Sequence, residues 1–152
     1  MLSQSQTIDA IERIDLSYLE DRYRKTAEEG FLPFADALAE FKRFLALVAR
    51  QNEPLAVTNK SVDHLWHTFL IHSKSYADFC QAAFGEFIHH QPHSPQFPVP
   101  LVAITNVFKA YEDAFGDVPD SWFDGEHLTR ESVSRGELPD ALAFEWSGWT
   151  GR

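Results

Sequence analysis

Six of the seven histidines lie in one stretch of the chain, between Asp63 and His93, together with the only cysteine. Imidazole and thiolate are ligands that zinc prefers, and a nearby carboxylate either binds the ion or accepts a hydrogen bond from a ligating histidine. This stretch is therefore where we expect chemistry. The predicted metal ligands are Asp63, His67, Cys80, His89 and His90.

The spacing of these residues indicates how they meet. Asp63 and His67 are four residues apart, so on a helix their side chains lie about 40° apart on one face. Cys80 belongs to the next predicted helix, and a short turn between the two helices favours an antiparallel hairpin that brings both faces together. His89 and His90 come just after the end of this second helix, so either of them could turn into the site. The sequence thus predicts one divalent ion, with zinc favoured.

Two other interpretations of the same residues stay open. Cys80 could be a nucleophile that His67 activates and Asp63 orients. Alternatively, Asp63 and His67 form a buried hydrogen-bonded pair that only fixes the hairpin, in a protein that acts as a protein–protein interaction module. If the protein is an enzyme, metal-assisted hydrolysis or oxidation would place Asp63, His67 and His90 at the metal, with an open position for water. Whether the protein is an enzyme is undecided.

Five helices are predicted to position these residues, because apolar side chains recur at steps of three and four residues. The helices cover residues 17–28, 34–51, 62–72, 75–87 and 101–115. Four prolines between Gln91 and Pro100 predict an extended loop without regular structure. No convincing strand pattern accompanies the helices. The predicted fold is all-α, with residues 1–123 forming one helical bundle domain of about five helices.

Residues 124–152 are predicted to form an irregular, acidic C-terminal arm. Leu142, Phe144 and Trp146 alternate in a way that suits an extended segment with one apolar face. The arm either docks on the chain's own helices or uses Trp146 and Trp149 to anchor a protein partner or a second copy of the chain.

Composition excludes several classes of function. The chain has 152 residues, and 13 Lys and Arg against 23 Asp and Glu give a net charge of −10, so nucleic-acid binding is not expected. No stretch approaches the roughly 20 apolar residues of a membrane span, and the first residues lack the pattern of a signal peptide. With one cysteine, the composition favours a cytoplasmic protein.

The histidine segment also resembles a known signature. Residues 62–70 read VDHLWHTFL, residues 76–80 read YADFC and residues 84–90 read FGEFIHH. This series is similar to that of glycine-rich domain-like proteins, the small bacterial relatives of the N-terminal region of plant glycine-rich domain proteins. A looser resemblance extends over most of the first 123 residues. The matching positions are Asp63, Trp66, His67, Tyr76, Cys80, Gly85 and His90.

The resemblance implies a site, with Trp66, Tyr76 and Gly85 among the residues that line it, and it implies no particular reaction. His64 is added to the lining residues because it flanks His67 on the same helix. The chain departs from the plant proteins at Phe69, where they often carry a second histidine on the same turn, and it has no glycine-rich extension.

Overall fold

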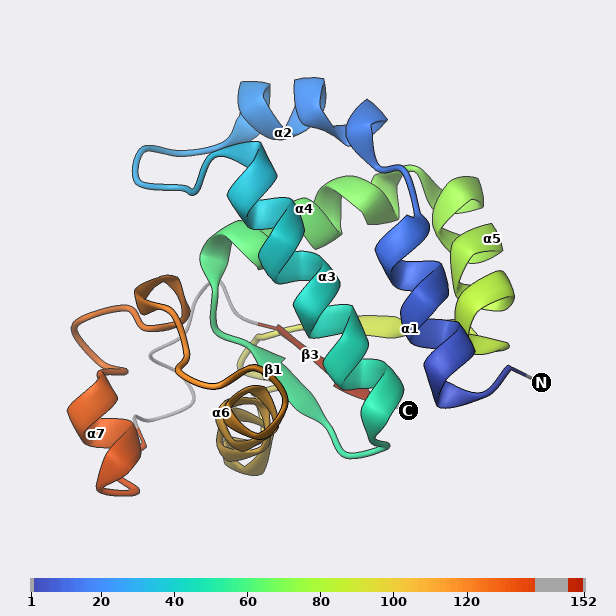
Figure 1. Ribbon diagram of the computed structural model, residues 1–152. Coiled ribbons are helices and arrows are strands. Elements are labelled where there is room, and N and C mark those ends of the chain that lie inside the picture. Colours follow the sequence, from blue (N-terminus) through green and yellow to red (C-terminus); the bar gives the residue numbers. More distant parts are fainter. Residues whose placement is uncertain (1, 139–147, 152) are drawn as a thin grey trace.

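The structure is a computed structural model that describes residues 2–138 and 148–151 (Figure 1). Most of these residues are helical. The helices are α1 (Gln4–Arg13), α2 (Glu20–Thr26), α3 (Phe34–Arg50), α4 (Lys60–Ile71), α5 (Ser73–Phe84), α6 (Leu101–Phe115) and α7 (Arg130–Ser134), with 3₁₀ turns η1 (Ser17–Leu19) and η2 (Asp120–Trp122). The strands are β1 (Leu55–Val57), β2 (His89–Pro92) and β3 (Gly148–Gly151).

The three strands form one antiparallel sheet in the order β1-β3-β2. The prediction of an all-α fold is therefore wrong in this part, and the fold is mostly helical with a small sheet. There are physical reasons why the sequence pattern did not reveal the strands. β1 has three residues and is buried throughout, so it shows no alternation, and β2 consists of polar residues ending in Pro92. The second half of β2, Gln91 and Pro92, lies within the region predicted as loop.

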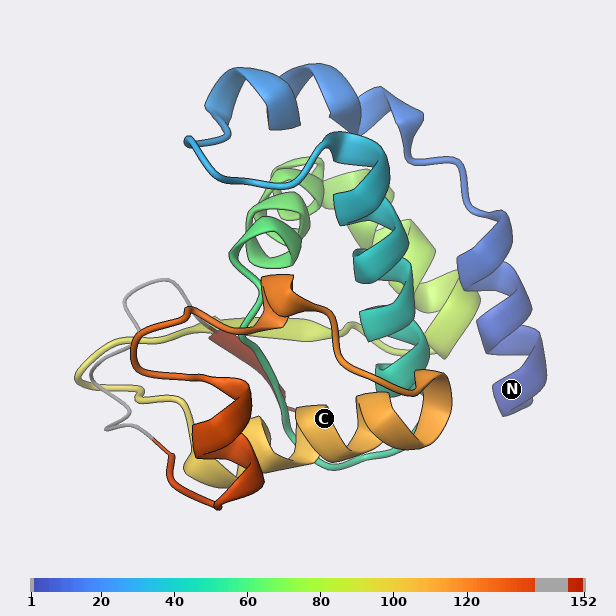
Figure 2. The same ribbon diagram turned by 60° about the vertical axis from the view of Figure 1, so that its left-hand side comes forward.

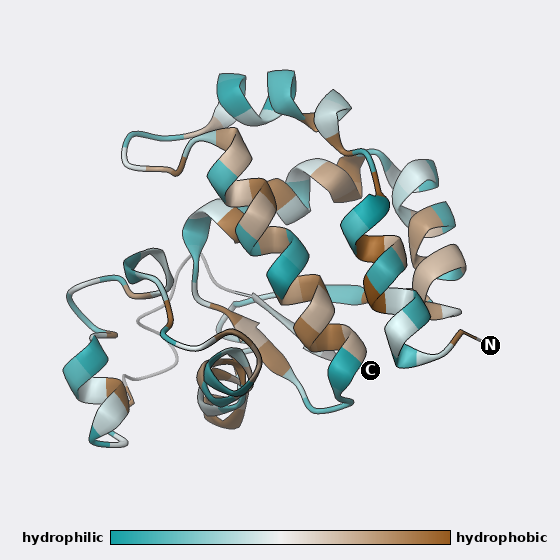
Figure 3. Cartoon of the chain, viewed as in Figure 1, coloured by the Kyte–Doolittle hydropathy of each residue, from teal (hydrophilic) through white to brown (hydrophobic). Residues whose placement is uncertain are grey.

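Helices α3 and α4 form the centre of the helical part. α3 packs against α1, α4 and α6, and α2 lies across the ends of α3 and α4 (Figures 1 and 2). On α4, Leu65, Trp66 and Phe69 are fully buried, which fits its apolar surface. Hydrophobic residues recur along α3 and α4, whereas α2 is largely hydrophilic (Figure 3).

Helix α1 was not predicted from the sequence. Its N-terminus is a capping box in which Ser3 and Gln6 bond to each other's backbone, a signal that the sequence does carry. α1 contributes Ile11 to the core, and the Thr7 hydroxyl donates to the carbonyl oxygen of Ala83 in α5 at 2.6 Å. The helix predicted over residues 17–28 is in fact η1 followed by the shorter α2.

A buried carboxylate joins three elements at one end of the core. Oε1 of Glu40, on α3, accepts hydrogen bonds from the Tyr111 hydroxyl of α6 and from the Trp122 indole of η2, both at 2.7 Å. Arg43 donates to the same Tyr111 hydroxyl at 2.8 Å. Burial raises the pKa of Tyr111 to about 12, so this phenol stays protonated at neutral pH.

The C-terminal arm is only partly irregular. It contains α7, which begins with a capping box between Thr129 and Ser132, and it ends in β3. Because β3 lies between β1 and β2, residues 148–151 dock on the chain itself, with Trp149 packed partly buried against the core. Trp146, like Leu142 and Phe144, lies outside the described residues.

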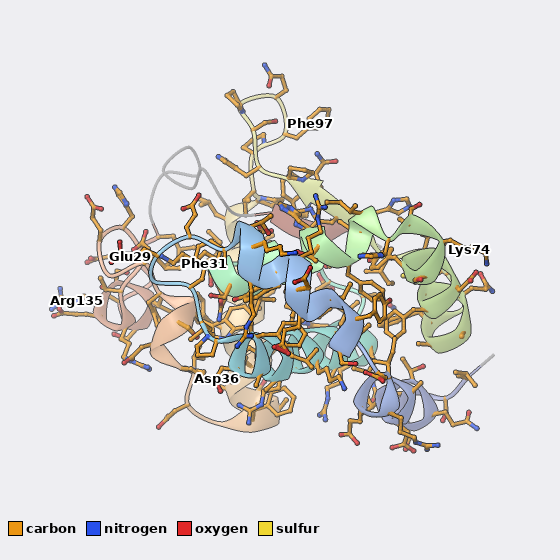
Figure 4. The ribbon with its side chains drawn as sticks, turned by 90° about the horizontal axis from the view of Figure 1, so that it is seen from above. Glu29, Phe31, Asp36, Lys74, Phe97 and Arg135 are labelled. Carbon is orange, nitrogen blue, oxygen red and sulfur yellow. The ribbon has the colours of Figure 1, made fainter. Side chains whose placement is uncertain are left out.

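The loop between β2 and α6 extends away from the body of the protein (Figure 4). A turn closed by two backbone hydrogen bonds between Ser94 and Phe97 holds its tip, where Phe97 is 58% exposed. Among the described residues, no helix combines the length and the apolar character that crossing a membrane requires.

Candidate metal centre

Helix α4 supplies two residues of the site. Asn59 caps this helix by accepting hydrogen bonds from the backbone N–H groups of Ser61 and Val62, which fixes the first turn. Asp63 follows in that turn, where the positive end of the helix dipole favours a carboxylate, and only 7% of its side chain is exposed. One turn later His67 lies on the same face, as the spacing predicts.

Strand β2 supplies the third residue. Successive side chains of a strand point to opposite faces, so His89 and His90 diverge. The His90 side chain is 2% exposed and points at Asp63. His89 is exposed and its ring packs against Phe87, with the ring centroids 4.8 Å apart. The structure thus selects His90, and the prediction of His89 as a ligand is not supported by its position.

The three side chains converge on one carboxylate oxygen. Nε2 of His90 is 2.7 Å from Oδ1 of Asp63, and Nε2 of His67 is 3.7 Å from the same oxygen. One ligand atom from each residue can be chosen so that all three lie within 4.8 Å of one another. Two imidazoles and one carboxylate are a donor set used for zinc and for non-haem iron.

The cluster is closed on one side and open on the other. His67 has 45% of its side chain exposed, so solvent reaches the group past this residue. Partial burial lowers the pKa of His67 more than the neighbouring Asp63 raises it, so the imidazole is neutral at pH 7. The unprotonated nitrogen of a neutral imidazole is the group that coordinates a metal ion.

Trp66 packs against the buried side of the site. The indole lies 4.4 Å from the His90 ring between centroids, at an interplanar angle of 78°. Its N–H donates to the Tyr76 hydroxyl at 3.0 Å, and this hydroxyl in turn donates to the carbonyl oxygen of Ile88, two residues before His90. Trp66 and Tyr76, expected as lining residues, therefore support His90 from α4 and α5.

Cys80 does not belong to the cluster. The residue is 1% exposed, and its thiol neighbours the Tyr76 hydroxyl and the backbone of Ile88 instead of the two histidines. The prediction of Cys80 as a ligand assumed that the helix hairpin would turn this face toward Asp63, but the third residue of the cluster that could hold an ion comes from β2. Burial raises the pKa of the Cys80 thiol, which also argues against an activated nucleophile.

This position leads to a prediction for thiol labelling. We expect Cys80 to react slowly with iodoacetamide in the native protein at pH 7.5 and rapidly in denaturant, because a buried neutral thiol must be exposed before it reacts. A chelator should not change the native rate, since the thiol holds no metal. Mass spectrometry of the labelled chain gives the rates, and a chelator-induced acceleration would restore Cys80 as a ligand.

Two other expected lining residues lie elsewhere. His64 turns toward α2, where its Nε2 is 2.9 Å from the Thr26 hydroxyl and its ring lies 5.3 Å from that of Tyr23. Gly85 ends α5 with a φ of +74°, a conformation that suits glycine, and so redirects the chain toward β2.

Sequence reasoning missed Gly148 of β3, which packs directly against the His90 ring. Its position depends on a strand pairing between segments almost 60 residues apart, for which the local sequence carries no signal.

Comparison with known proteins gives one relationship. Residues 10–96 match the family described as UCP032817-like, and this range includes Asp63, His67 and His90. No curated protein and no solved structure gives a significant match. The resemblance to glycine-rich domain-like proteins stays a prediction, because the matching family carries a different description. Since more than half of its residues match, the chain belongs to the UCP032817-like family.

Proposed function

We propose that the protein binds one divalent metal ion, with zinc favoured, through Asp63, His67 and His90. The observation that carries the proposal is the convergence of both Nε2 atoms on Oδ1 of Asp63, at 2.7 and 3.7 Å, from two separate elements of the fold. An ion held by these atoms would replace the proton in the hydrogen bond between His90 and Asp63.

Three protein ligands leave a coordination position open, as in catalytic zinc sites. The exposed edge of His67 provides the path by which water would reach that position. When bound, zinc lowers the pKa of its water ligand to about 7 and so supplies a nucleophile for hydrolysis. Metal-assisted hydrolysis is therefore the reaction class that the site supports best, with oxidation as the alternative if the ion is iron.

Elemental analysis after zinc loading tests the proposal. We expect untagged protein dialysed against zinc and then against buffer to retain one ion per chain. Asp63→Asn should retain none, because an amide keeps the shape of the side chain and removes the negative charge that binds the cation. His89→Ala is the matched control and should bind like the wild type, since His89 points away from the cluster. A wild type without zinc would favour the purely structural pair in an interaction module.

A further inference from the structure

Strand β3 carries a glycine, Gly148, at the position next to the cluster, and the packing there depends on its having no side chain. A Cβ atom placed on Gly148 would lie 2.6 Å from Cε1 and 3.0 Å from Nε2 of His90, and 2.7 Å from the carbonyl oxygen of Gln91. These separations are shorter than van der Waals contact. Gly148 is not among the glycines with a positive φ, so its backbone would accept another residue. Space next to His90 is what demands glycine here.

His90 is thereby held between two surfaces. Trp66 supports one side of the imidazole, as described above, and the backbone of Gly148 closes another. The ring lies between them with its Nε2 2.7 Å from Oδ1 of Asp63. A methyl group at position 148 would have to displace the ring or separate β3 from β2.

We propose that Gly148 is a positioning residue of the metal site, which holds the imidazole of His90 toward Asp63 because it has no side chain. The inference rests on the proposed metal binding and extends it to the C-terminal strand. Gly148 lies beyond residues 10–96, which match the family, so a segment outside the matched range completes the site.

Strand β3 also provides a matched control. Thr150 is buried, and its hydroxyl oxygen accepts a hydrogen bond from the backbone N–H of Leu55 at 3.3 Å. This contact docks β3 on β1, and Thr150 also lies directly opposite His90 in the pairing of β3 with β2. Thr150→Val keeps the shape of the side chain and removes the acceptor, so it weakens the docking of β3 without filling the space next to His90.

The experiment compares the wild type, Gly148→Ala and Thr150→Val in three measurements: thermal unfolding, cobalt(II) affinity from visible absorption, and the ring ¹⁵N shifts of His90 in metal-free protein. A carboxylate accepts only from a protonated nitrogen, so the wild type should show the Nε2–H form of His90. We expect Gly148→Ala to lose this pure tautomer and to bind cobalt about 10- to 100-fold more weakly, the range found when the support of a ligand is removed. Thr150→Val should lower the melting temperature and keep both the tautomer and the affinity.

Two results would overturn the inference: a Gly148→Ala protein with the wild-type ring shifts of His90, or a Thr150→Val protein with ring shifts changed as much as those of Gly148→Ala. If Gly148→Ala does not fold, nuclear Overhauser effects between the Gly148 α protons and Hε1 of His90 decide the matter in the wild type, and their absence counts against the inference. A wild type that binds no cobalt contradicts the proposed function, whereas the ring shifts still decide the role of Gly148.

Discussion

His90→Ala is expected to abolish stable zinc binding and to destabilise the metal-free protein as well. Because supporting residues around a metal site are worth 10- to 100-fold in affinity, the loss of a ligand should weaken binding by at least about 100-fold. The Asp63 carboxylate, with 7% of its side chain exposed, would lose its 2.7 Å hydrogen bond, at a cost of about 1–3 kcal/mol in the free energy of unfolding. Zinc titration calorimetry and urea unfolding measure the two effects.

His89→Ala and His67→Ala are the controls for that result. His89 is adjacent in sequence and exposed, so its replacement should change neither quantity. His67 is 45% exposed and 3.7 Å from Asp63, so its replacement should remove zinc binding at a smaller cost in stability than His90→Ala. Equal behaviour of His90→Ala and His89→Ala in both measurements would contradict the assignment of His90.

Glu40→Leu is expected to cause the largest loss of stability. The substitution leaves two buried donors, the Tyr111 hydroxyl and the Trp122 indole N–H, without the oxygen that accepts both at 2.7 Å. At about 1–3 kcal/mol for each unsatisfied group, the free energy of unfolding should fall by about 4 kcal/mol. The melting temperature should then fall by about 10 °C, which differential scanning calorimetry measures.

Glu112→Leu makes the same chemical change at an exposed position of α6, and it should shift the melting temperature little. If Glu40→Leu were as stable as Glu112→Leu, the buried carboxylate would not hold α3, α6 and η2 together. Since Glu40 lies on α3 and the candidate metal site on α4 and β2, the proposal predicts that folded Glu40→Leu protein still binds zinc.

Much of the helical part could be predicted from the sequence, because long amphipathic segments carry a strong periodic signal. The helices over residues 34–51 and 101–115 agree with α3 and α6 within a residue. The short strands could not be predicted, because each has three or four residues and their pairing joins segments far apart in the chain. Local patterns do not record such pairings.

The part of the candidate site that lies on a helix could be predicted from the sequence, and the part that lies on a strand could not. Asp63 and His67 meet because helical spacing alone brings them together. The choice between His89 and His90 depends on the pleat of a strand that the sequence did not reveal, so it stayed open until the structure was known. Cys80 was included because thiolate is a good zinc ligand, and residue chemistry alone does not show which way a helix faces.

The most direct test of the metal site is anomalous diffraction from crystals of the untagged protein soaked with zinc, with data collected on both sides of the zinc absorption edge. The account predicts one anomalous peak per chain, about 2.0–2.2 Å from a carboxylate oxygen of Asp63 and from Nε2 of both His67 and His90. No peak at these residues, or a peak at Cys80 or His89 in its place, would contradict it.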